Sequence, residues 1–215
     1  MISPTARIYP NVRLGASVEI GDFAIVGVPP RGRTEGALPT VIGDGAVIRS
    51  HSVIYAGNVI GSHFQTGHHV MIREENQIGD DVSVGTSSVV EHHVRIADGA
   101  RIHTQAFVPE YSVLEAGAWI GPNVALTNAL HPLCPKAKEC LKGPTIKRGA
   151  KIGANSTILP YVVVGEDALV GAGSVVVKDV PPRMVVAGNP ARVVKDIDAL
   201  TCPLELIDKP YGGEL

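Results

Sequence analysis

The chain carries an aliphatic residue at every sixth position over most of its length. Twenty-five such positions run from Ile8 to Val26, from Ile42 to Leu126 and from Ile146 to Val176, and all are Ile, Leu or Val except Thr66. The residue two places earlier is usually Ala or Ser, and residues two apart in a strand share one face. Each six-residue unit therefore predicts one short strand followed by one corner.

A glycine directly follows the aliphatic residue in twelve of the twenty-five units. We expect this glycine to supply the positive φ of a tight corner. One unit cannot bury its own apolar stripe, so neighbouring units must stack, as in repeat solenoids. Three units make one triangular coil, so residues three units apart stack on one another. About eight such coils, at ~4.8 Å each, give an all-β, parallel β-helix about 40 Å long.

Two segments interrupt the period, residues 28–40 (VPPRGRTEGALPT) and residues 129–143 (ALHPLCPKAKECLKG). Insertions in solenoids are loops that often carry binding surface. Beyond the last unit we expect an extended turn and a short C-terminal helix from about Pro190, which covers the open strand edges. The predicted organisation is a β-helix domain over residues 1–180 and a cap and tail over residues 181–215.

The composition indicates the cellular environment of the protein and argues against some classes of partner. The formal net charge of -2 argues against nucleic acid, because phosphate binding needs a basic surface. No apolar run approaches the ~18 residues of a membrane span, and MISPTARIYP lacks the blocks of a signal peptide. Three cysteines, an odd number, favour reduced thiols over a disulfide framework. We therefore expect a cytoplasmic protein with no membrane partner.

The repeats and the ending IGANSTILPYVVVGEDALVGAGSVVVKDVPPRMVVAGNPARVV resemble the left-handed β-helix acyltransferases, hexapeptide-repeat enzymes that use acetyl-CoA. The resemblance covers roughly residues 6–196. It alone implies the left hand, since parallel crossovers are otherwise right-handed in about 98% of cases. It also implies a homotrimer with each active site in the groove between two prisms.

A closer resemblance concerns the acceptor. The segments VALTNALHP, PTIKRGAKIGANSTILP and AGNPARVV look most like the bacterial N-acetyltransferases that modify nucleotide-linked amino sugars for surface polysaccharide. The first insertion, with its PPRG segment, also resembles the loop of the nucleotide-sugar O-acyltransferases of lipid A synthesis. Both resemblances imply a sugar nucleotide as acceptor.

The donor site is expected near the C-terminal coils. Pantetheine is a slender chain with two amides, so it needs a groove with approachable backbone groups. Small corner residues provide such a groove at Gly153, Ala154, Gly171 and Ala172. Their alternative role is that of ordinary corner residues.

The phosphates of CoA require cations. The resemblance implies that the adenine nucleotide end lies against Lys178, Arg183, Arg192 and Lys195 and under the turn from Gly188 to Pro190. The alternatives are solvated basic side chains and a turn that only starts the cap helix, with proline at its first position.

Acetyl transfer needs an acceptor that loses a proton, and histidine suits that work near pH 7. His131, in NALHPLCP, resembles the histidine of the His-Pro-Leu segment of galactoside and maltose O-acetyltransferases, where it is the general base. His68 and His69 are the second candidates. They follow Phe64 and Thr66, which break the repeat rule, and local rules tend to break at functional sites.

Stacking of one coil on the next places His69 above His51 and puts Glu74, His92 and Glu110 in another column. A carboxylate beside His92 would raise its pKa and orient its ring. We therefore expect His92 and Glu74 to contact substrate. The alternative is a ladder of polar side chains on a solvent-exposed face.

Three asparagines differ in their expected roles. Asn58 and Asn76 occupy inward positions one coil apart and are expected to form a stacked amide pair with mutual hydrogen bonds. Asn128, just before the second insertion, is expected to hold the acceptor or the thioester carbonyl, with a simple turn residue as the alternative. Backbone N–H groups would stabilise the oxyanion whichever side chain is the base.

The predicted function is an acetyl-CoA-dependent acetyltransferase that N-acetylates a nucleotide-linked amino sugar by direct attack in a ternary complex. One alternative is a sugar O-acetyltransferase. Another is a non-catalytic β-helix subunit, which would not need the small-residue groove together with the AGNPAR turn.

A metal-dependent enzyme is the remaining alternative, although no metal is expected. Carbonic-anhydrase-like solenoids bind zinc through three histidines, and His63 and His68 supply a pair but Gly27 stands at the third position. Cys134 and Cys140 share the second insertion with one histidine, whereas a structural zinc site wants four ligands.

Overall fold

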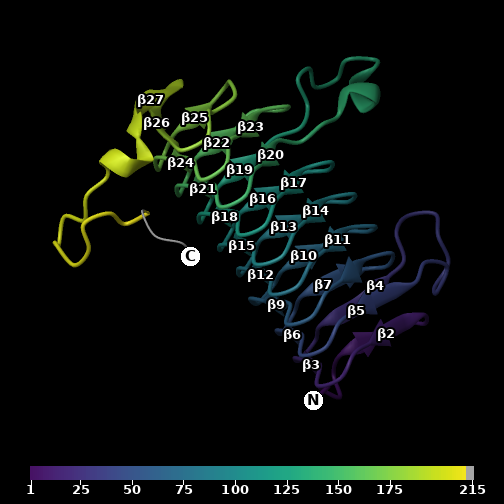
Figure 1. Cartoon of the computed structure of the whole chain (residues 1–215). Helices are drawn as coiled ribbons and strands as arrows, with labels where there is room; N and C mark the ends of the chain where they lie inside the picture. The colour runs from purple at the N-terminus through teal and green to yellow at the C-terminus, as the bar shows by residue number, and fades with distance from the viewer. Residues whose placement is uncertain (212–215) are drawn as a thin grey trace.

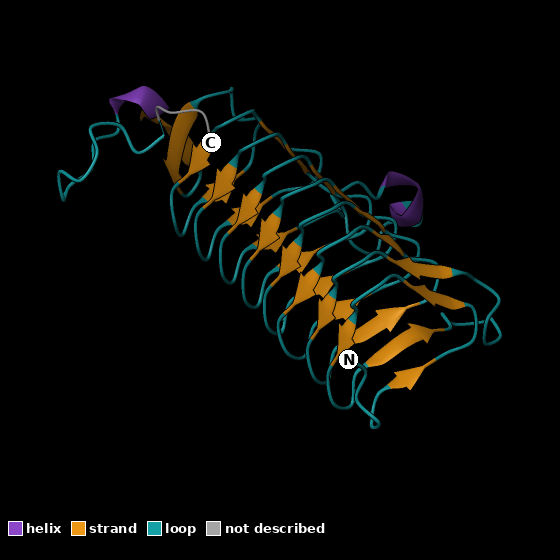
Figure 2. Cartoon of the chain, turned by 60° about the horizontal axis from the view of Figure 1, so that its bottom comes forward, coloured by secondary structure: helices purple, strands orange, loops and turns teal. Residues whose placement is uncertain are grey.

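Three sheets of short strands run along a triangular prism (Figure 1 and Figure 2). The computed structural model describes residues 1–211. Each coil adds one strand to each sheet in turn, so the strands pair in parallel along the prism. This confirms the all-β, parallel β-helix predicted from the repeat. We name the edges of the prism corner I–II, corner II–III and corner III–I, after the sheets that meet there.

The strands of the three sheets have the following bounds. Sheet I contains β1 Arg7–Ile8, β4 Ile25–Val28, β7 Val53–Tyr55, β10 Met71–Ile72, β13 Val89–Val90, β16 Phe107–Val108, β19 Ala125–Leu126, β22 Thr157–Ile158 and β25 Val175–Val176. Sheet II contains β2 Val12–Leu14, β5 Thr40–Ile42, β8 Val59–Ile60, β11 Gln77–Ile78, β14 Arg95–Ile96, β17 Val113–Leu114, β20 Thr145–Ile146 and β23 Val163–Val164. Sheet III contains β3 Glu19–Ile20, β6 Val47–Ile48, β9 Gln65–Thr66, β12 Ser83–Val84, β15 Arg101–Ile102, β18 Trp119–Ile120, β21 Lys151–Ile152, β24 Leu169–Val170, β26 Met184–Gly188 and β27 Ala191–Asp196.

The aliphatic positions of the repeat point inward and form the core. Ile54 and Val108, for example, are fully buried. The two residues that break the repeat rule, Phe64 and Thr66, are buried in the same prism. Thr66 Oγ1 accepts a hydrogen bond from the backbone N–H of Arg49 at 2.9 Å. The break in the rule therefore serves packing.

The glycines that follow the aliphatic positions have a different role from the one expected. Of these twelve glycines only Gly27 has a positive φ, and the left-handed residue of most corners comes two places later, as at His51 (61°) and His69 (55°). A Cβ at Gly67 would lie 2.3 Å from the backbone nitrogen of Thr86 in the next coil. Glycine is required there because the coils approach closely, not because of its φ.

The predicted short helix from about Pro190 is wrong. Gly188, with φ 101°, ends β26, and β27 returns antiparallel to β26. The free edge of sheet III offers backbone partners at this point, and the β-branched Val193 and Val194 suit a strand. A short 3-10 helix, η2 Ile197–Ala199, follows β27. Among residues 1–211 no helix is long and apolar enough to cross a membrane.

Both insertions leave the prism at corner I–II. Residues 28–40 connect β4 to β5, and residues 129–143 connect β19 to β20 and contain the 3-10 helix η1 Ala137–Cys140. The strands on either side keep their pairing, since β2 pairs with β5 and β17 with β20. The two loops therefore flank one stretch of a single edge (Figure 1).

We predict that Gly85→Ala lowers the free energy of unfolding by about 1–3 kcal/mol through overpacking. The added Cβ would lie 2.4 Å from the backbone nitrogen of Thr104. Equilibrium denaturation monitored by circular dichroism measures the change. Ser83→Ala, in the adjoining strand β12, is the matched control and should leave stability nearly unchanged. Equal stability of the two variants would contradict the close-approach argument.

Candidate functional site

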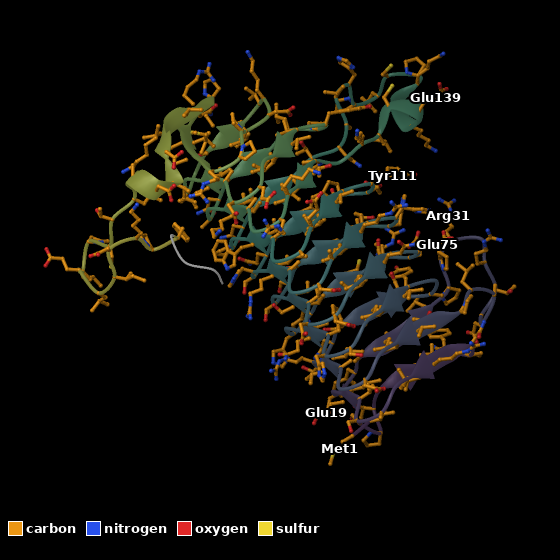
Figure 3. The ribbon with its side chains drawn as sticks, viewed as in Figure 1. Met1, Glu19, Arg31, Glu75, Tyr111 and Glu139 are labelled. Carbon is orange, nitrogen blue, oxygen red and sulfur yellow. The ribbon has the colours of Figure 1, made fainter. Side chains whose placement is uncertain are left out.

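A column of polar side chains lies at corner I–II between the two loops. Glu74, His92, Glu110 and Asn128 follow strands β10, β13, β16 and β19 at intervals of one coil, so they stack on one another. Figure 3 shows Glu75 and Tyr111 on the same side of the prism as residues of the two loops. The column predicted for Glu74, His92 and Glu110 is therefore present, and Asn128 continues it.

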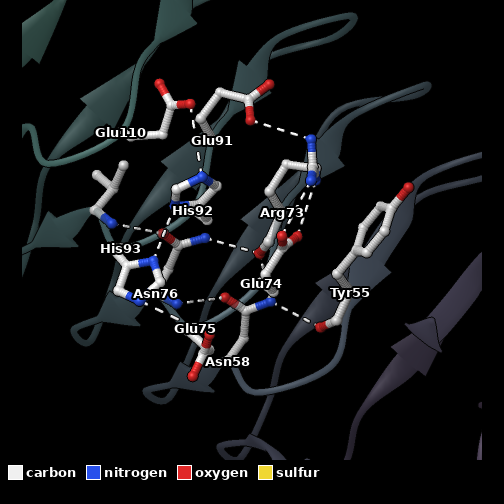
Figure 4. A network of polar contacts seen from close by, with 11 residues as sticks. Tyr55, Asn58, Arg73, Glu74, Glu75, Asn76, Glu91, His92, His93 and Glu110 are labelled. Carbon is white, nitrogen blue, oxygen red and sulfur yellow. Dashed lines mark hydrogen bonds and ion pairs between the residues drawn. The ribbon is translucent and has the colours of Figure 1, made fainter. Parts of the chain in front are cut away.

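The upper part of the column is a chain of contacts (Figure 4 shows its His92 and Glu110 members). Asn128 Nδ2 donates a hydrogen bond to Glu110 Oε2 at 2.6 Å. The other carboxylate oxygen of Glu110 faces His92 Nε2 at 3.5 Å. Asn128 therefore orients the carboxylate, and the carboxylate orients the imidazole.

A second histidine completes the cluster. His92 Nδ1 and His93 Nδ1 are 2.8 Å apart, and His93 Nε2 lies 3.7 Å from Glu75 Oε2. The ring of Tyr111 contacts both imidazoles, with ring centroids 5.9 and 5.7 Å away. A hydrogen bond between two δ nitrogens requires that only one of them carries hydrogen, so at most one ring is cationic.

An arginine neutralises the acidic side of the corner. Arg73 forms a bidentate contact with Glu74, at 2.9 and 3.0 Å, and reaches Glu91 at 3.2 Å. Burial acts to raise the pKa of Glu74, but the hydrogen bonds and charge of Arg73 hold it below its ordinary value. Burial raises the pKa of Glu91, against the opposing effect of Arg73. Glu74 is thus engaged by Arg73 in this arrangement.

The buried side chains of Asn58 and Asn76 stabilise this corner through hydrogen bonds to the backbone. The predicted hydrogen bonds between the two side chains are absent. Asn58 Oδ1 accepts from the backbone N–H of Asn76 at 2.9 Å, and Asn76 Oδ1 accepts from that of Val94 at 2.7 Å. Their amide nitrogens donate to backbone carbonyls, including that of Arg73. The amides therefore pair with backbone N–H and carbonyl groups of successive turns, and this pairing allows them to be buried.

His131 lies in the second loop, on the same corner as the column. It is exposed, and with Cys134 and Cys140 it lines a small hollow. The loop is closed at its base by a hydrogen bond from the backbone N–H of Lys142 to the carbonyl of Asn128, at 3.1 Å. Within residues 1–211, no group of three His, Cys, Asp or Glu side chains is arranged to hold a metal ion.

His68 and His69 lie on a different edge, corner III–I, after β9. The ring of His69 stacks on that of His51 at 4.8 Å, as the coil repeat predicts. His68 Nδ1 is 2.8 Å from Ser50 Oγ. Within one chain the structure therefore does not bring these histidines together with His131.

The small residues expected to cradle CoA also lie at corner III–I. Gly153 and Ala154 follow β21, and Gly171 and Ala172 follow β24. A Cβ on Gly153 would lie 2.5 Å from the backbone nitrogen of Ala172, so coil stacking alone requires this glycine. Ala172 is exposed, and the other three residues are half-buried.

The basic residues expected at the CoA phosphates do not gather on one corner. Lys178 follows β25 at corner I–II, whereas the backbone N–H of Arg183 bonds to the carbonyl of Glu166 at corner II–III. Arg192 and Lys195 lie on β27, and Pro190 lies in the turn before it. The guanidinium of Arg183 contacts Asp198. Within one chain these residues therefore lie apart, because the chain end folds back as a strand at the edge of sheet III.

Sequence reasoning missed His93, Glu75 and Tyr111, and it missed His103. The Nε2 atom of His103 is buried without a hydrogen-bond partner among the described residues, and its ring packs on Trp119 at 4.5 Å. Burial, with a smaller effect from the nearby Arg101, lowers the pKa of His103. The sequence did indicate that His103 is unusual, because it takes the position that glycine occupies in the neighbouring coils.

We predict that His103 makes stability fall in mild acid. Because its pKa is lower in the folded than in the unfolded chain, the folded protein binds fewer protons below about pH 6.5, and the free energy of unfolding decreases as pH falls. Denaturation of the wild type and His103→Leu at pH 7.5 and 5.5 checks this. The wild type should lose more stability than the variant. Equal losses would show that His103 does not contribute.

Part of the chain is similar in sequence to known transferases. Residues 143–178 match the family model described as bacterial transferase hexapeptide (six repeats). Galactoside O-acetyltransferase of Escherichia coli K12 is 38% identical over 96 residues, which are 42% of this chain and 47% of that protein. dTDP-3-amino-3,6-dideoxy-alpha-D-galactopyranose 3-N-acetyltransferase of Aneurinibacillus thermoaerophilus is 48% identical over 63 residues, 29% and 33% of the two chains. The chain thus spans less than half the length of these relatives.

Solved structures extend the likeness to the whole prism. The UDP-N-acetylglucosamine acyltransferase of Francisella novicida aligns with a TM-score of 0.53 at 17% identity, covering 91% of this chain and 70% of that one. The acyltransferase LpxA of Acinetobacter baumannii aligns with a TM-score of 0.51 at 20% identity, covering 91% and 74%. These alignments confirm the predicted left-handed β-helix.

Proposed function

We propose that this chain, of which residues 143–178 match the bacterial transferase hexapeptide family, is an acetyl-CoA-dependent acetyltransferase that N-acetylates a nucleotide-linked amino sugar. The observation that supports this most is the chain of contacts at corner I–II from Asn128 through Glu110 to His92 and His93. We further propose a cytoplasmic homotrimer, with residues 1–180 as the catalytic prism and residues 181–215 as its cap and tail, of which residues 212–215 lie outside the described part of the chain.

From these contacts we assign the tautomers of the two histidines and the basic nitrogen. The carboxylate of Glu110 accepts hydrogen, so His92 carries its hydrogen on Nε2. His92 Nδ1 is then an acceptor, and His93 donates to it from Nδ1. In neutral His93 the Nε2 atom then carries the lone pair; it faces Glu75 at 3.7 Å and the residue is exposed, and we assign it as the general base of this proposal.

The proposed reaction follows from that basic nitrogen. The acceptor amine attacks the thioester carbonyl carbon, its proton passes to His93 Nε2, and the carbon–sulfur bond breaks as the CoA thiolate leaves. Glu75, at 3.7 Å, stabilises the imidazolium that forms. Backbone N–H groups of the corner would stabilise the developing oxyanion. Asn128, His92 and Glu74 hold this arrangement around the acceptor, and His131 is assigned as an acceptor anchor on the neighbouring loop.

The donor side of the proposal uses corner III–I. Gly153, Ala154, Gly171 and Ala172 would admit the pantetheine chain, with Pro190 and Arg192 as proposed contacts of the nucleotide end. Lys178 lies at corner I–II and Arg183 at corner II–III, so within one chain these two residues are not part of the proposed donor site. Since corner III–I differs from the corner of His93, we propose that corner III–I of one subunit faces corner I–II of the next. Donor and base then meet between subunits of the trimer.

We predict that His93→Gln lowers kcat by about 10²- to 10⁴-fold, because it removes the base but keeps a polar side chain. Thiol release from acetyl-CoA with a panel of UDP- and dTDP-linked amino sugars measures it. His63→Gln, which replaces a histidine of similar φ (57° against 56°) on corner II–III, is the control. Loss of turnover in His131→Gln with full turnover in His93→Gln would move the base to the second loop. Release only with hydroxyl acceptors would make the enzyme an O-acetyltransferase.

We predict that two inactive variants complement each other. His93→Gln lacks the base, and Ala172→Trp blocks the exposed donor corner. If each site is shared between subunits, mixed trimers formed by coexpression should recover about a quarter of the wild-type turnover. Mixing the separately purified trimers without exchange is the control. No recovery in mixed trimers would place the whole site within one chain.

A further inference from the structure

A groove crosses sheet II beside the proposed base. Two adjoining hollows, of about 380 and 460 Å³, share Gln77, Arg95 and Val113 in their lining. The first hollow also includes His93 and Tyr111 of corner I–II. The groove therefore begins at the basic nitrogen of the proposed site and leads away from it over β11, β14 and β17.

Among the charged residues that line the groove, only Arg95 lacks a polar side-chain contact within residues 1–211. Glu75 lies 3.7 Å from His93, and Glu115 forms a 2.7 Å ion pair with Lys147. Arg95 is exposed and makes no ion pair or side-chain hydrogen bond with the residues that the structure describes. An uncompensated guanidinium with five donors suits a phosphate group.

The surroundings of Arg95 suit a molecule larger than a free anion. Val59, 55% exposed, offers an apolar surface on one side, and the ring of Tyr111, 42% exposed, stands at the corner. The amide of Gln77 can donate and accept hydrogen bonds beside the guanidinium. These surroundings fit a phosphate that is joined to ring systems: the guanidinium would bind the phosphate, and the aromatic and apolar side chains would pack against the rings.

We propose that this groove binds the phosphate-bearing part of the acceptor, with Arg95 on the phosphate and the reacting amine at His93. The proposal rests on the proposed function, in that the acceptor is a sugar joined to a nucleoside diphosphate. In such a molecule the diphosphate is bonded to the anomeric carbon of the sugar, several bonds from an amine elsewhere on the ring, and Arg95 is likewise displaced from His93 along the groove. CoA also carries phosphates, so the experiment must separate the two sources.

The test is calorimetric titration of the purified full-length protein with UDP, dTDP and CoA, each without an acetyl donor. Arg95→Gln should weaken binding of the better nucleoside diphosphate at least 10-fold and leave CoA affinity unchanged. Arg13→Gln is the matched control, because Arg13 lies in the same outward column of sheet II, four strands from Arg95. It should change neither affinity.

Three results would overturn the proposal. They are failure of the wild type to bind either nucleoside diphosphate, an unchanged nucleotide affinity in Arg95→Gln, and a selective loss of CoA affinity, which would assign the groove to the donor. The binding readout is independent of turnover, so nucleotide binding without thiol release would reject the transferase function alone. With an active acceptor, Arg95→Gln should raise KM and keep kcat, which distinguishes it from loss of the base.

Discussion

In-register stacking of coils is the constraint on which the rest of the structure depends. Each strand hydrogen-bonds to the equivalent strand of the next coil, as Gly67 N–H does to the carbonyl of Val84 at 2.7 Å. A Cβ would lie within 3 Å of the next coil at most of the glycines that follow the aliphatic positions, and the ladder aligns every corner with the corner above it. The period therefore governs both the core and the positions at which polar side chains can meet.

The polar column shows how a site can arise from this register alone. Glu74, His92, Glu110 and Asn128 are far apart in the chain but adjacent in space because each occupies the same position of its coil. A carboxylate above an imidazole requires only one acidic residue placed one coil after a histidine. The asparagine ladder inside the corner then holds the turns that carry these groups.

The repeat was sufficient to predict the sheets, the inward residues, the stacking of His69 on His51 and the column around His92. Other features depended on neighbours that a period does not describe. The strand β27 replaced the expected helix because the edge of sheet III was available. The significance of His93 depends on ring orientations, and that of His103 on the cover provided by Trp119.

The position of the two insertions makes the folding of the prism independent of the loops. Both begin and end at corner I–II, and the strands on either side pair as though the loops were absent. Doubling the length of such a loop costs only about 0.6 kcal/mol in closure entropy. Loops of different length and sequence can therefore be accommodated at one edge, while the strand pairing of the prism stays unchanged.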